Sequence, residues 1–227
     1  YALTEAQDRA VHEIIEDMSQ GHRMNRLLQG DVGSGKTLVA FLAVLNAVES
    51  GGQGVLMAPT EILARQHLES LRPLAMAAGV EIDILTRRDK GSERNAKLSR
   101  LLTGNIQLLI GTHAVFQTDV AFGDLRLVVV DEQHRFGVAQ RARLWKKNKY
   151  PPHVLVMTAT PIPRTLSMTL YGDLDVSTSK SQNNITMSQW IIDEVLDSGF
   201  GASGTKRRAG KLEASMNAMN EFMGALK

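Results

Sequence analysis

Two hydrophobic patterns alternate along the chain up to about residue 176. Continuous apolar runs such as Leu127-Val128-Val129-Val130 predict strands that are buried on both faces. Longer segments with apolar residues every three or four positions predict amphipathic helices. We expect strands at 27–29, 54–58, 82–85, 106–110, 125–130 and 154–157, and helices at 4–18, 38–48, 61–77, 92–103, 136–146 and 163–171. This alternation favours an α/β domain with a mostly parallel, doubly wound sheet.

The pattern changes after about residue 176. Residues 177–184 are polar and linker-like, and nothing beyond them predicts a sheet strand. Two amphipathic segments follow, at about 186–197 and 211–226, joined by a glycine-rich loop that carries Lys206-Arg207-Arg208. We therefore expect one domain at 1–180 and a short helical C-terminal appendage at 181–227. Because short helices are marginal alone in water, the apolar faces of this tail need a partner. That partner could be the surface of the first domain, the other tail segment in a helical hairpin, or a second chain, and we expect docking on the same chain.

Composition narrows the class of protein. The 227 residues are 43% hydrophobic, enough for a sizeable core, and the net charge of +2 means that any nucleic-acid site must be local. The absence of cysteine fits a reducing compartment and excludes disulfides, thiolate metal sites and cysteine nucleophiles. No apolar run is long enough to span a membrane, and the first residues do not resemble a signal peptide. Because the chain starts at Tyr1 rather than Met, we expect it to be part of a larger protein.

The most specific motif lies between the first expected strand and the helix after it. It fits the phosphate-binding pattern G-x-x-x-x-G-K-[ST], and its residues are Gly30, Asp31, Val32, Gly33, Ser34, Gly35, Lys36 and Thr37. Glycines let several backbone N–H groups point at one anion, and the helix adds its positive N-terminal end. Lys36 would place its charge on the β- and γ-phosphates, and the Thr37 hydroxyl would ligate Mg²⁺. The motif therefore predicts ATP and Mg²⁺ as cofactors.

A second part of the same site is expected after the strand at 125–130. That strand runs directly into Asp131 and Glu132. Ligands gather at the carboxyl ends of the strands in such sheets, so both acids should lie near the phosphate loop. Asp131 can hold Mg²⁺ through its water shell, and Glu132 can polarise the attacking water. We therefore expect Lys36, Asp131 and Glu132 to be the catalytic residues.

Several motifs occur together in an order and spacing that resemble the superfamily-two helicases. They are Gly30–Thr37, Ala58-Pro59-Thr60, Gly111-Thr112-His113, Asp131–His134 and Thr158-Ala159-Thr160. The longer runs at 131–138 and 157–166 resemble the RecG-type branched-DNA helicases of bacteria, and this narrower resemblance covers about residues 1–176. The transcription-repair coupling translocases share the run at 161–166, but Ser34 and Gln133-His134 favour the RecG type.

The resemblance implies the RecA-like fold of a first motor domain and the activity of an ATP-dependent DNA helicase. It implies that Gln7 reads the adenine edge. The implied DNA-binding residues are Thr60, Arg65, Thr112 and His113, and the residues that would couple nucleotide state to DNA binding are Gln133, His134, Thr158 and Thr160. The partner would be branched or forked DNA, held by its phosphates without reading of sequence. The basic residues Arg94, Lys97 and Arg100, in contrast, are most simply one solvated helix face.

The resemblance is incomplete. The second motor domain, which supplies an arginine finger, and the wedge domain that splits branched DNA are missing from this chain, and the residues from about 177 do not continue the family's sequence. We therefore expect the ATP-binding half of a motor for DNA repair and recombination in the bacterial cytoplasm, weakly active alone. Two other functions stay open: the motor lobe of a transcription-repair coupling double-strand DNA translocase, and a regulatory nucleotide-binding module that does not hydrolyse ATP. Glu132 argues against the regulatory module, because a pure switch can dispense with a catalytic acid.

Overall fold

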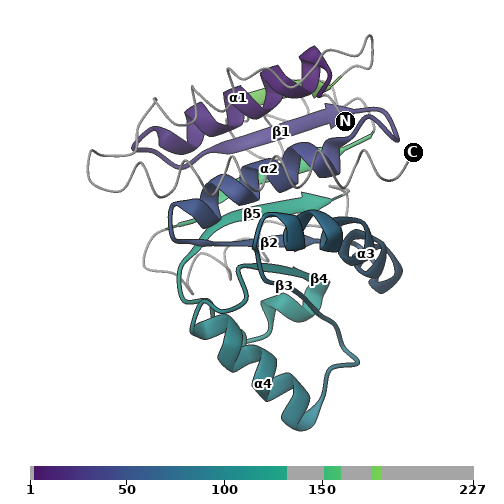
Figure 1. The fold of residues 1–227 in the computed structure, drawn as a ribbon, viewed down its shortest axis with the longest axis vertical. Coiled ribbons are helices and arrows are strands. Elements are labelled where there is room, and N and C mark those ends of the chain that lie inside the picture. Colours follow the sequence, from purple (N-terminus) through teal and green to yellow (C-terminus); the bar gives the residue numbers. More distant parts are fainter. Residues whose placement is uncertain (1–2, 132–150, 160–174, 180–227) are drawn as a thin grey trace.

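A parallel sheet lies at the centre of the described part of the chain (Figure 1). The computed structural model describes residues 3–131, 151–159 and 175–179, the last of these for the backbone only. Within these residues the sheet order is β3-β4-β2-β5-β6-β1-β7, and every pairing is parallel. The strands are β1 (Asn25–Gly30), β2 (Gln53–Met57), β3 (Ile82–Leu85), β4 (Leu108–Gly111), β5 (Leu125–Asp131), β6 (His153–Thr158) and β7 (Asp175–Ser179). The helices are α1 (Glu5–Ser19), α2 (Lys36–Glu49), α3 (Glu61–Ala77), α4 (Gly91–Leu102) and the 3-10 helix η1 (His113–Phe116).

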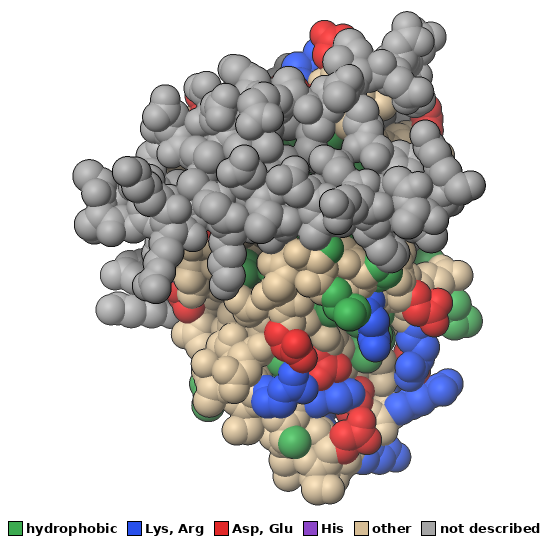
Figure 2. Space-filling view, in the orientation of Figure 1, with side chains coloured by type: hydrophobic (Ala, Val, Ile, Leu, Met, Phe, Trp, Pro, Cys, Tyr) green, Lys and Arg blue, Asp and Glu red, His purple; other side chains and the backbone are tan. Residues whose placement is uncertain are grey.

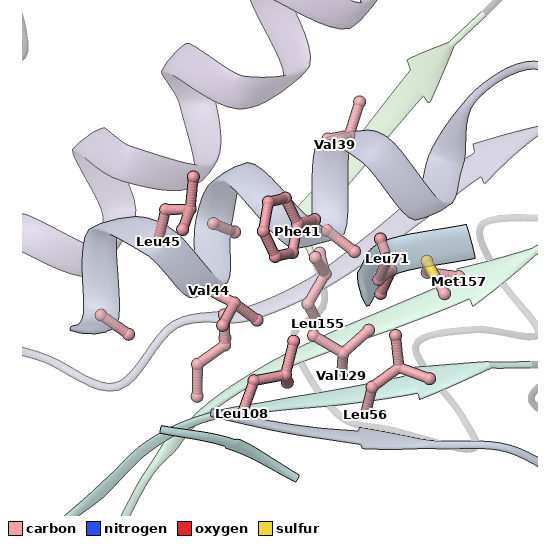
Figure 3. Packing of buried hydrophobic residues seen from close by; sticks show 14 of the residues in the cluster. Val39, Phe41, Val44, Leu45, Leu56, Leu71, Leu108, Val129, Leu155 and Met157 are labelled. Atoms are coloured by element: carbon pink, nitrogen blue, oxygen red, sulfur yellow. The ribbon is translucent and has the colours of Figure 1, made fainter. Parts of the chain in front are cut away.

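The strand residues alternate between two hydrophobic cores, one on each face of the sheet. On one face, sheet residues such as Val129 and Leu155 pack under α1, α2 and α3, and Phe41 of α2 is fully buried there (Figure 3). On the other face, Val128 and Val154 pack with residues of α4 and η1. Burial of each large apolar side chain contributes roughly 1.5–3 kcal/mol. The expected doubly wound α/β sheet is confirmed, and the unbroken apolar runs are explained because both faces are covered.

Two helices begin at threonine caps that the site depends on. Thr4 and Gln7 form a reciprocal capping box at the start of α1: the Thr4 hydroxyl oxygen accepts from the Gln7 N–H at 3.2 Å, and Gln7 Oε1 accepts from the Thr4 N–H at 2.9 Å. Thr60 caps α3, where its Oγ1 accepts from the Leu63 N–H at 3.2 Å. These caps fix where each helix starts, and they hold Gln7 and Thr60 at the edge of the sheet where β1 and β2 end.

The expectation that residues 177–184 are linker-like is wrong for residues 177–179. Residues 175–179 form β7, which pairs in parallel with β1, from Arg26 opposite Asp175 to Gly30 opposite Ser179. The segment lacks the apolar run of an internal strand, but it lies at the end of the sheet order, where it needs a partner on one side only. The helices expected at 136–146, 163–171, 186–197 and 211–226 lie outside the described residues.

The basic residues of α4 do not form a simple solvated face, so that expectation is also wrong. Arg94 Nη2 lies 2.9 Å from Asp119, Arg100 Nη2 lies 2.6 Å from Glu81, and Lys97 is paired with Asp89. Figure 2 shows Lys and Arg side chains interspersed with Asp and Glu over the part of the molecule that carries α4 in Figure 1. Charges paired in this way fix the helix to neighbouring segments and leave little net field for attracting a polyanion.

No helix in the described part of the chain combines the length and the apolar character needed to cross a bilayer.

Candidate active site

The phosphate loop joins the carboxyl end of β1 to the first residue of α2. Its shape depends on two glycines in the left-handed region, Gly33 with φ of 80° and Gly35 with φ of 79°. Gly35 is the N-cap of α2, and its carbonyl accepts from the N–H groups of Leu38 and Val39 at 2.9 and 3.2 Å. Residues with a Cβ rarely adopt this backbone conformation. The motif expected from the sequence thus has the strand–loop–helix geometry that phosphate binding requires.

The charge of Lys36 lies within the loop itself. Its Nζ donates to the carbonyl oxygens of Gly30 and Asp31, each at 2.7 Å. Two carbonyl oxygens of the loop therefore hold the ammonium. Phosphate oxygens carry negative charge, so they would compete well with these two neutral carbonyls for the N–H donors of the Lys36 ammonium. Thr37 lies in the first turn of α2 and is half-buried, and Val32 at the tip of the loop is exposed.

Gln7 ties α1 to the phosphate loop. While its Oε1 completes the capping box with Thr4, its Nε2 donates to the Ser34 carbonyl at 2.7 Å. The amide packs tightly, because a Cβ added at Gly35 would lie within 3.0 Å of Gln7 Nε2. Residues 27 positions apart are thus joined by a single side chain. This places Gln7 directly against the loop, where the resemblance implied a contact with the base of the nucleotide.

Asp131 lies at the same edge of the sheet as the phosphate loop. It ends β5, β6 is the next strand, and β1 follows. Adjacent strands lie about 4.8 Å apart, so the ends of β5 and β1 are about 10 Å apart. Thr158 ends β6 between them and is buried. Lys36, Thr158 and Asp131 therefore lie at the same edge of the sheet.

The structure adds a residue that the sequence did not single out. His67 of α3 lies with Nε2 at 2.7 Å from Oδ2 of Asp131, and the two side chains are 13% and 16% exposed. An ionised carboxylate can only accept, so the imidazole donates from Nε2. No motif marks His67 in the sequence, and the contact spans 64 positions.

Other expected site residues follow neighbouring strands at this edge. Thr60 begins α3 after β2, and Thr112 and His113 come directly after β4, which pairs with β2. The loops that carry them are linked by the Ala58 N–H, which donates to the Gly111 carbonyl at 2.8 Å. Arg65 is exposed on α3 and lies 3.0 Å from Glu61. The four residues that the resemblance assigned to DNA therefore lie on adjacent segments.

Four expected site residues cannot be placed. Glu132, Gln133, His134 and Thr160 lie outside the described residues. Their assignments stay predictions from the sequence.

The fold and the loop together define a P-loop domain, a parallel α/β sheet with an anion-binding loop after its first strand. The chain belongs to the DEAD/DEAH box helicase family, whose model matches residues 4–169. This confirms the helicase resemblance drawn from the motifs.

Individual relatives are more specific. The chain is 54% identical over 177 residues to the ATP-dependent DNA helicase RecG of Haemophilus influenzae, a match that covers 77% of this chain and 26% of that protein. Its identity to RecG of Bacillus subtilis is 55% over 177 residues, covering 78% of this chain and 26% of that protein. The chain thus spans about a quarter of the length of the curated relatives it matches.

Solved structures agree. A structure of RecG bound to a three-way DNA junction has a TM-score of 0.65 and 40% identity, covering 87% of this chain and 28% of that chain. The Pyrococcus furiosus Hef helicase domain has a TM-score of 0.58 at 23% identity, covering 80% of this chain and 38% of that chain, and that likeness concerns the fold alone.

Proposed function

We propose that this chain is the ATP-binding motor lobe of an ATP-dependent DNA helicase that remodels branched DNA in repair and recombination. The observation that carries the proposal is the phosphate loop with Lys36, held at the same sheet edge as Asp131. Identity of about 54% to RecG over this region supports the choice of helicase. Because those relatives are bacterial and act on DNA by name, we place the activity in the bacterial cytoplasm.

In this proposal the loop exchanges its own contacts for those of a nucleotide. Lys36 would leave the carbonyls of Gly30 and Asp31 and donate to the β- and γ-phosphates, while loop N–H groups hold the other oxygens. Residues 30–37 and Gln7 together would bind ATP. Glu132 would take a proton from the attacking water as the general base.

The donor set fits Mg²⁺ better than a metal that needs a protein cage. Thr37 and Asp131 offer oxygen ligands, the kind Mg²⁺ prefers, and this ion usually keeps several waters beside one or two carboxylates and phosphate oxygens. No group of three or more His, Cys, Asp or Glu side chains in the described part of the chain could hold a metal ion by itself. The ion would supply neutralisation of negative charge on the nucleotide phosphates.

The DNA side of the proposal rests on the loops after β2 and β4. Thr60, Arg65, Thr112 and His113 would contact phosphates through hydroxyl, guanidinium, imidazole and backbone N–H groups, which carry no sequence information. Thr158 and Thr160, with Gln133 and His134, would couple nucleotide state to this grip. Such binding should fall steeply with salt concentration, because it depends on phosphate contacts.

The full activity requires more than this chain. We propose that a second motor domain closes the ATP cleft with an arginine finger, which contributes roughly 10³–10⁵ in rate in related nucleotidases. A wedge domain would supply the separation of strands. The isolated chain should therefore hydrolyse ATP slowly and should not unwind forks; efficient fork unwinding by this chain alone would contradict the proposal.

We also propose that residues 1–180 form the ATP-binding domain and that 181–227 are accessory. The backbone supports a boundary near 180, because β7 ends at Ser179 and completes the partner strands of β1. A chain that ends after Lys180 should then bind ATP with nearly unchanged affinity.

Calorimetry of ATP binding tests the nucleotide site directly. Lys36→Ala should weaken binding about 10- to 100-fold, because hydrogen bonds to charged groups contribute about 1.5–3 kcal/mol. Lys90→Ala is the matched control, since Lys90 is an exposed lysine at the start of α4, on the other face of the sheet. Equal affinity of wild type and Lys36→Ala would show that the site is assigned wrongly.

A second variant separates binding from chemistry. Glu132→Gln keeps the size of the side chain but loses the base, so ATP binding should survive while hydrolysis falls about 10²–10⁴-fold. A regulatory module that never hydrolyses ATP would show no turnover in either protein. A double-strand translocase would differ by stimulation with linear duplex as strong as that with forked DNA.

A further inference from the structure

The contact between His67 and Asp131 joins two elements with different expected tasks. His67 lies on α3, the helix that begins at Thr60 and carries Arg65 on the expected DNA path. Asp131 ends β5, at the edge of the sheet expected to bind the nucleotide and its metal. The Nε2–Oδ2 distance of 2.7 Å is that of a strong hydrogen bond. His67, on the helix expected to contact DNA, therefore contacts Asp131, the carboxylate expected to act on the nucleotide.

The packing of α3 against the sheet restricts where the His67 side chain can lie. Its neighbours Ala64, Leu68 and Leu71 are buried against the sheet, so the helix cannot roll easily about its axis. The imidazole is only 13% exposed, which limits its rotamers and leaves little room for water to replace it. The packing of α3 thus delivers the Nε2–H to one place at the end of β5.

We propose that His67 is a positioning residue for the metal site: it orients the Asp131 carboxylate by donating to Oδ2. An ionised carboxylate has about four lone-pair sites, and one of them is used by the imidazole, so others remain for a hydrated Mg²⁺. A carboxylate without this partner would rotate more freely and would lose part of its preorganisation. Outer partners of metal-binding carboxylates typically change metal affinity about 10- to 100-fold when they are removed. The inference rests on the proposed function, because it needs Asp131 to act on a nucleotide-bound metal.

Two substitutions of similar size isolate the hydrogen bond. His67→Gln places an amide N–H near the position of Nε2, whereas His67→Leu fills similar space without a donor. Glu69→Ala is the control on the same helix, because Glu69 is exposed and faces away from the core. ATP binding is measured by calorimetry in excess EDTA and then across a series of Mg²⁺ concentrations, with melting temperatures recorded for every protein.

The Mg²⁺ dependence should follow the donor and not the bulk of residue 67. His67→Leu should raise the Mg²⁺ concentration at half-maximal effect about 10-fold, and ATP binding in EDTA should change less than about twofold. His67→Gln should recover most of the wild-type Mg²⁺ dependence, and Glu69→Ala should retain all of it. In an Asp131→Ala background the difference between the glutamine and leucine variants should disappear, since the acceptor is gone.

The possible failures are distinguishable. Identical Mg²⁺ dependence in wild type and His67→Leu would overturn the inference, and so would a lowered melting temperature with unchanged Mg²⁺ dependence, because His67 would then only fasten α3 to β5. If the leucine variant does not fold, His67→Ala removes the donor without adding an apolar group and takes its place. Wild-type protein that binds no ATP, with or without Mg²⁺, would overturn the proposed function and this inference with it.

Discussion

Substitution of the two left-handed glycines of the phosphate loop should separate backbone strain from a specific contact. Gly33 and Gly35 have nearly the same φ, 80° and 79°. Their surroundings differ: a Cβ at Gly33 would meet nothing within 4 Å, whereas a Cβ at Gly35 would clash with Gln7 Nε2. Gly33→Ala therefore carries only the strain of a left-handed alanine, and Gly35→Ala carries that strain and also displaces the Gln7 amide.

The structure gives the magnitude of each part. A left-handed alanine costs roughly 1–2 kcal/mol, which is the expected loss for Gly33→Ala. Displacement of Gln7 also breaks its 2.7 Å hydrogen bond to the Ser34 carbonyl, and a hydrogen bond of this kind contributes about 0.5–1.5 kcal/mol. Gly35→Ala should therefore lose about 1.5–3.5 kcal/mol in total. Both substitutions restrict the unfolded chain equally, so that effect cancels in the difference between them.

The assay is urea unfolding of the two alanine variants, alone and combined with Gln7→Ala. In the wild-type background Gly35→Ala should be less stable than Gly33→Ala by about 0.5–1.5 kcal/mol. In the Gln7→Ala background this excess should vanish, because the side chain that the new methyl group would displace is absent. Equal stability of the two variants with Gln7 present, or an excess that persists without Gln7, would refute the assignment of Gln7 as the tether between α1 and the loop.

Three further outcomes are expected. Gln53→Met should lower the free energy of unfolding by about 2–5 kcal/mol, because the buried Gln53 amide binds three backbone groups that would lose their partner. Gln107→Met is the control: the amide contact of Gln107 is exposed, so this substitution should cost less than about 1 kcal/mol, and equal losses in urea unfolding would contradict the prediction. Burial, with a smaller effect of a nearby arginine, lowers the pKa of His153, whose Nδ1 accepts from the Met24 N–H at 3.0 Å. The free energy of unfolding should therefore fall as the pH drops through about 6.5 toward the folded-state pKa. His153→Asn should flatten this pH dependence, and parallel stability curves for the two proteins would contradict the prediction. A chain that ends after residue 174 loses β7 and exposes the edge of β1, so it should aggregate on mild heating, whereas a chain that ends after Lys180 should not. Equal light scattering from the two chains would contradict the idea that β7 protects the edge of β1 from aggregation.

Local patterns were sufficient where a short segment determines its own structure. The phosphate loop needs glycine at positive φ and a helix directly after it, and both requirements are visible at residues 30–37. Unbroken apolar runs predict the buried strands, because both faces of the sheet are covered.

Contacts between distant segments were beyond the reach of these patterns. His67 and Asp131 meet only because α3 and β5 pack at the same edge, and neither residue type reveals the other. From the sequence alone, Arg94 and Arg100 look like a solvated face of α4. In the structure, Asp119 after η1 lies beside Arg94, and Glu81 before β3 and Asp83 in β3 lie beside Arg100. Strand β7 was missed because its hydrogen-bonded neighbour β1, and not an apolar run of its own, identifies it as a strand.

The hydrogen-bonding capacity of Gln7 has a consequence for the choice of base. A glutamine amide has two N–H donors and two acceptor lone pairs, and Ser34 and Thr4 use one of each. One donor and one lone pair are left on the same amide. Adenine presents an acceptor and a donor at N7 and N6, whereas guanine presents two acceptors at N7 and O6. Gln7 could therefore pair with adenine without releasing the loop, whereas guanine would leave the remaining lone pair facing another acceptor. GTP should then compete weakly with ATP for binding to the wild-type protein. In Gln7→Ala the difference in affinity between ATP and GTP should become smaller.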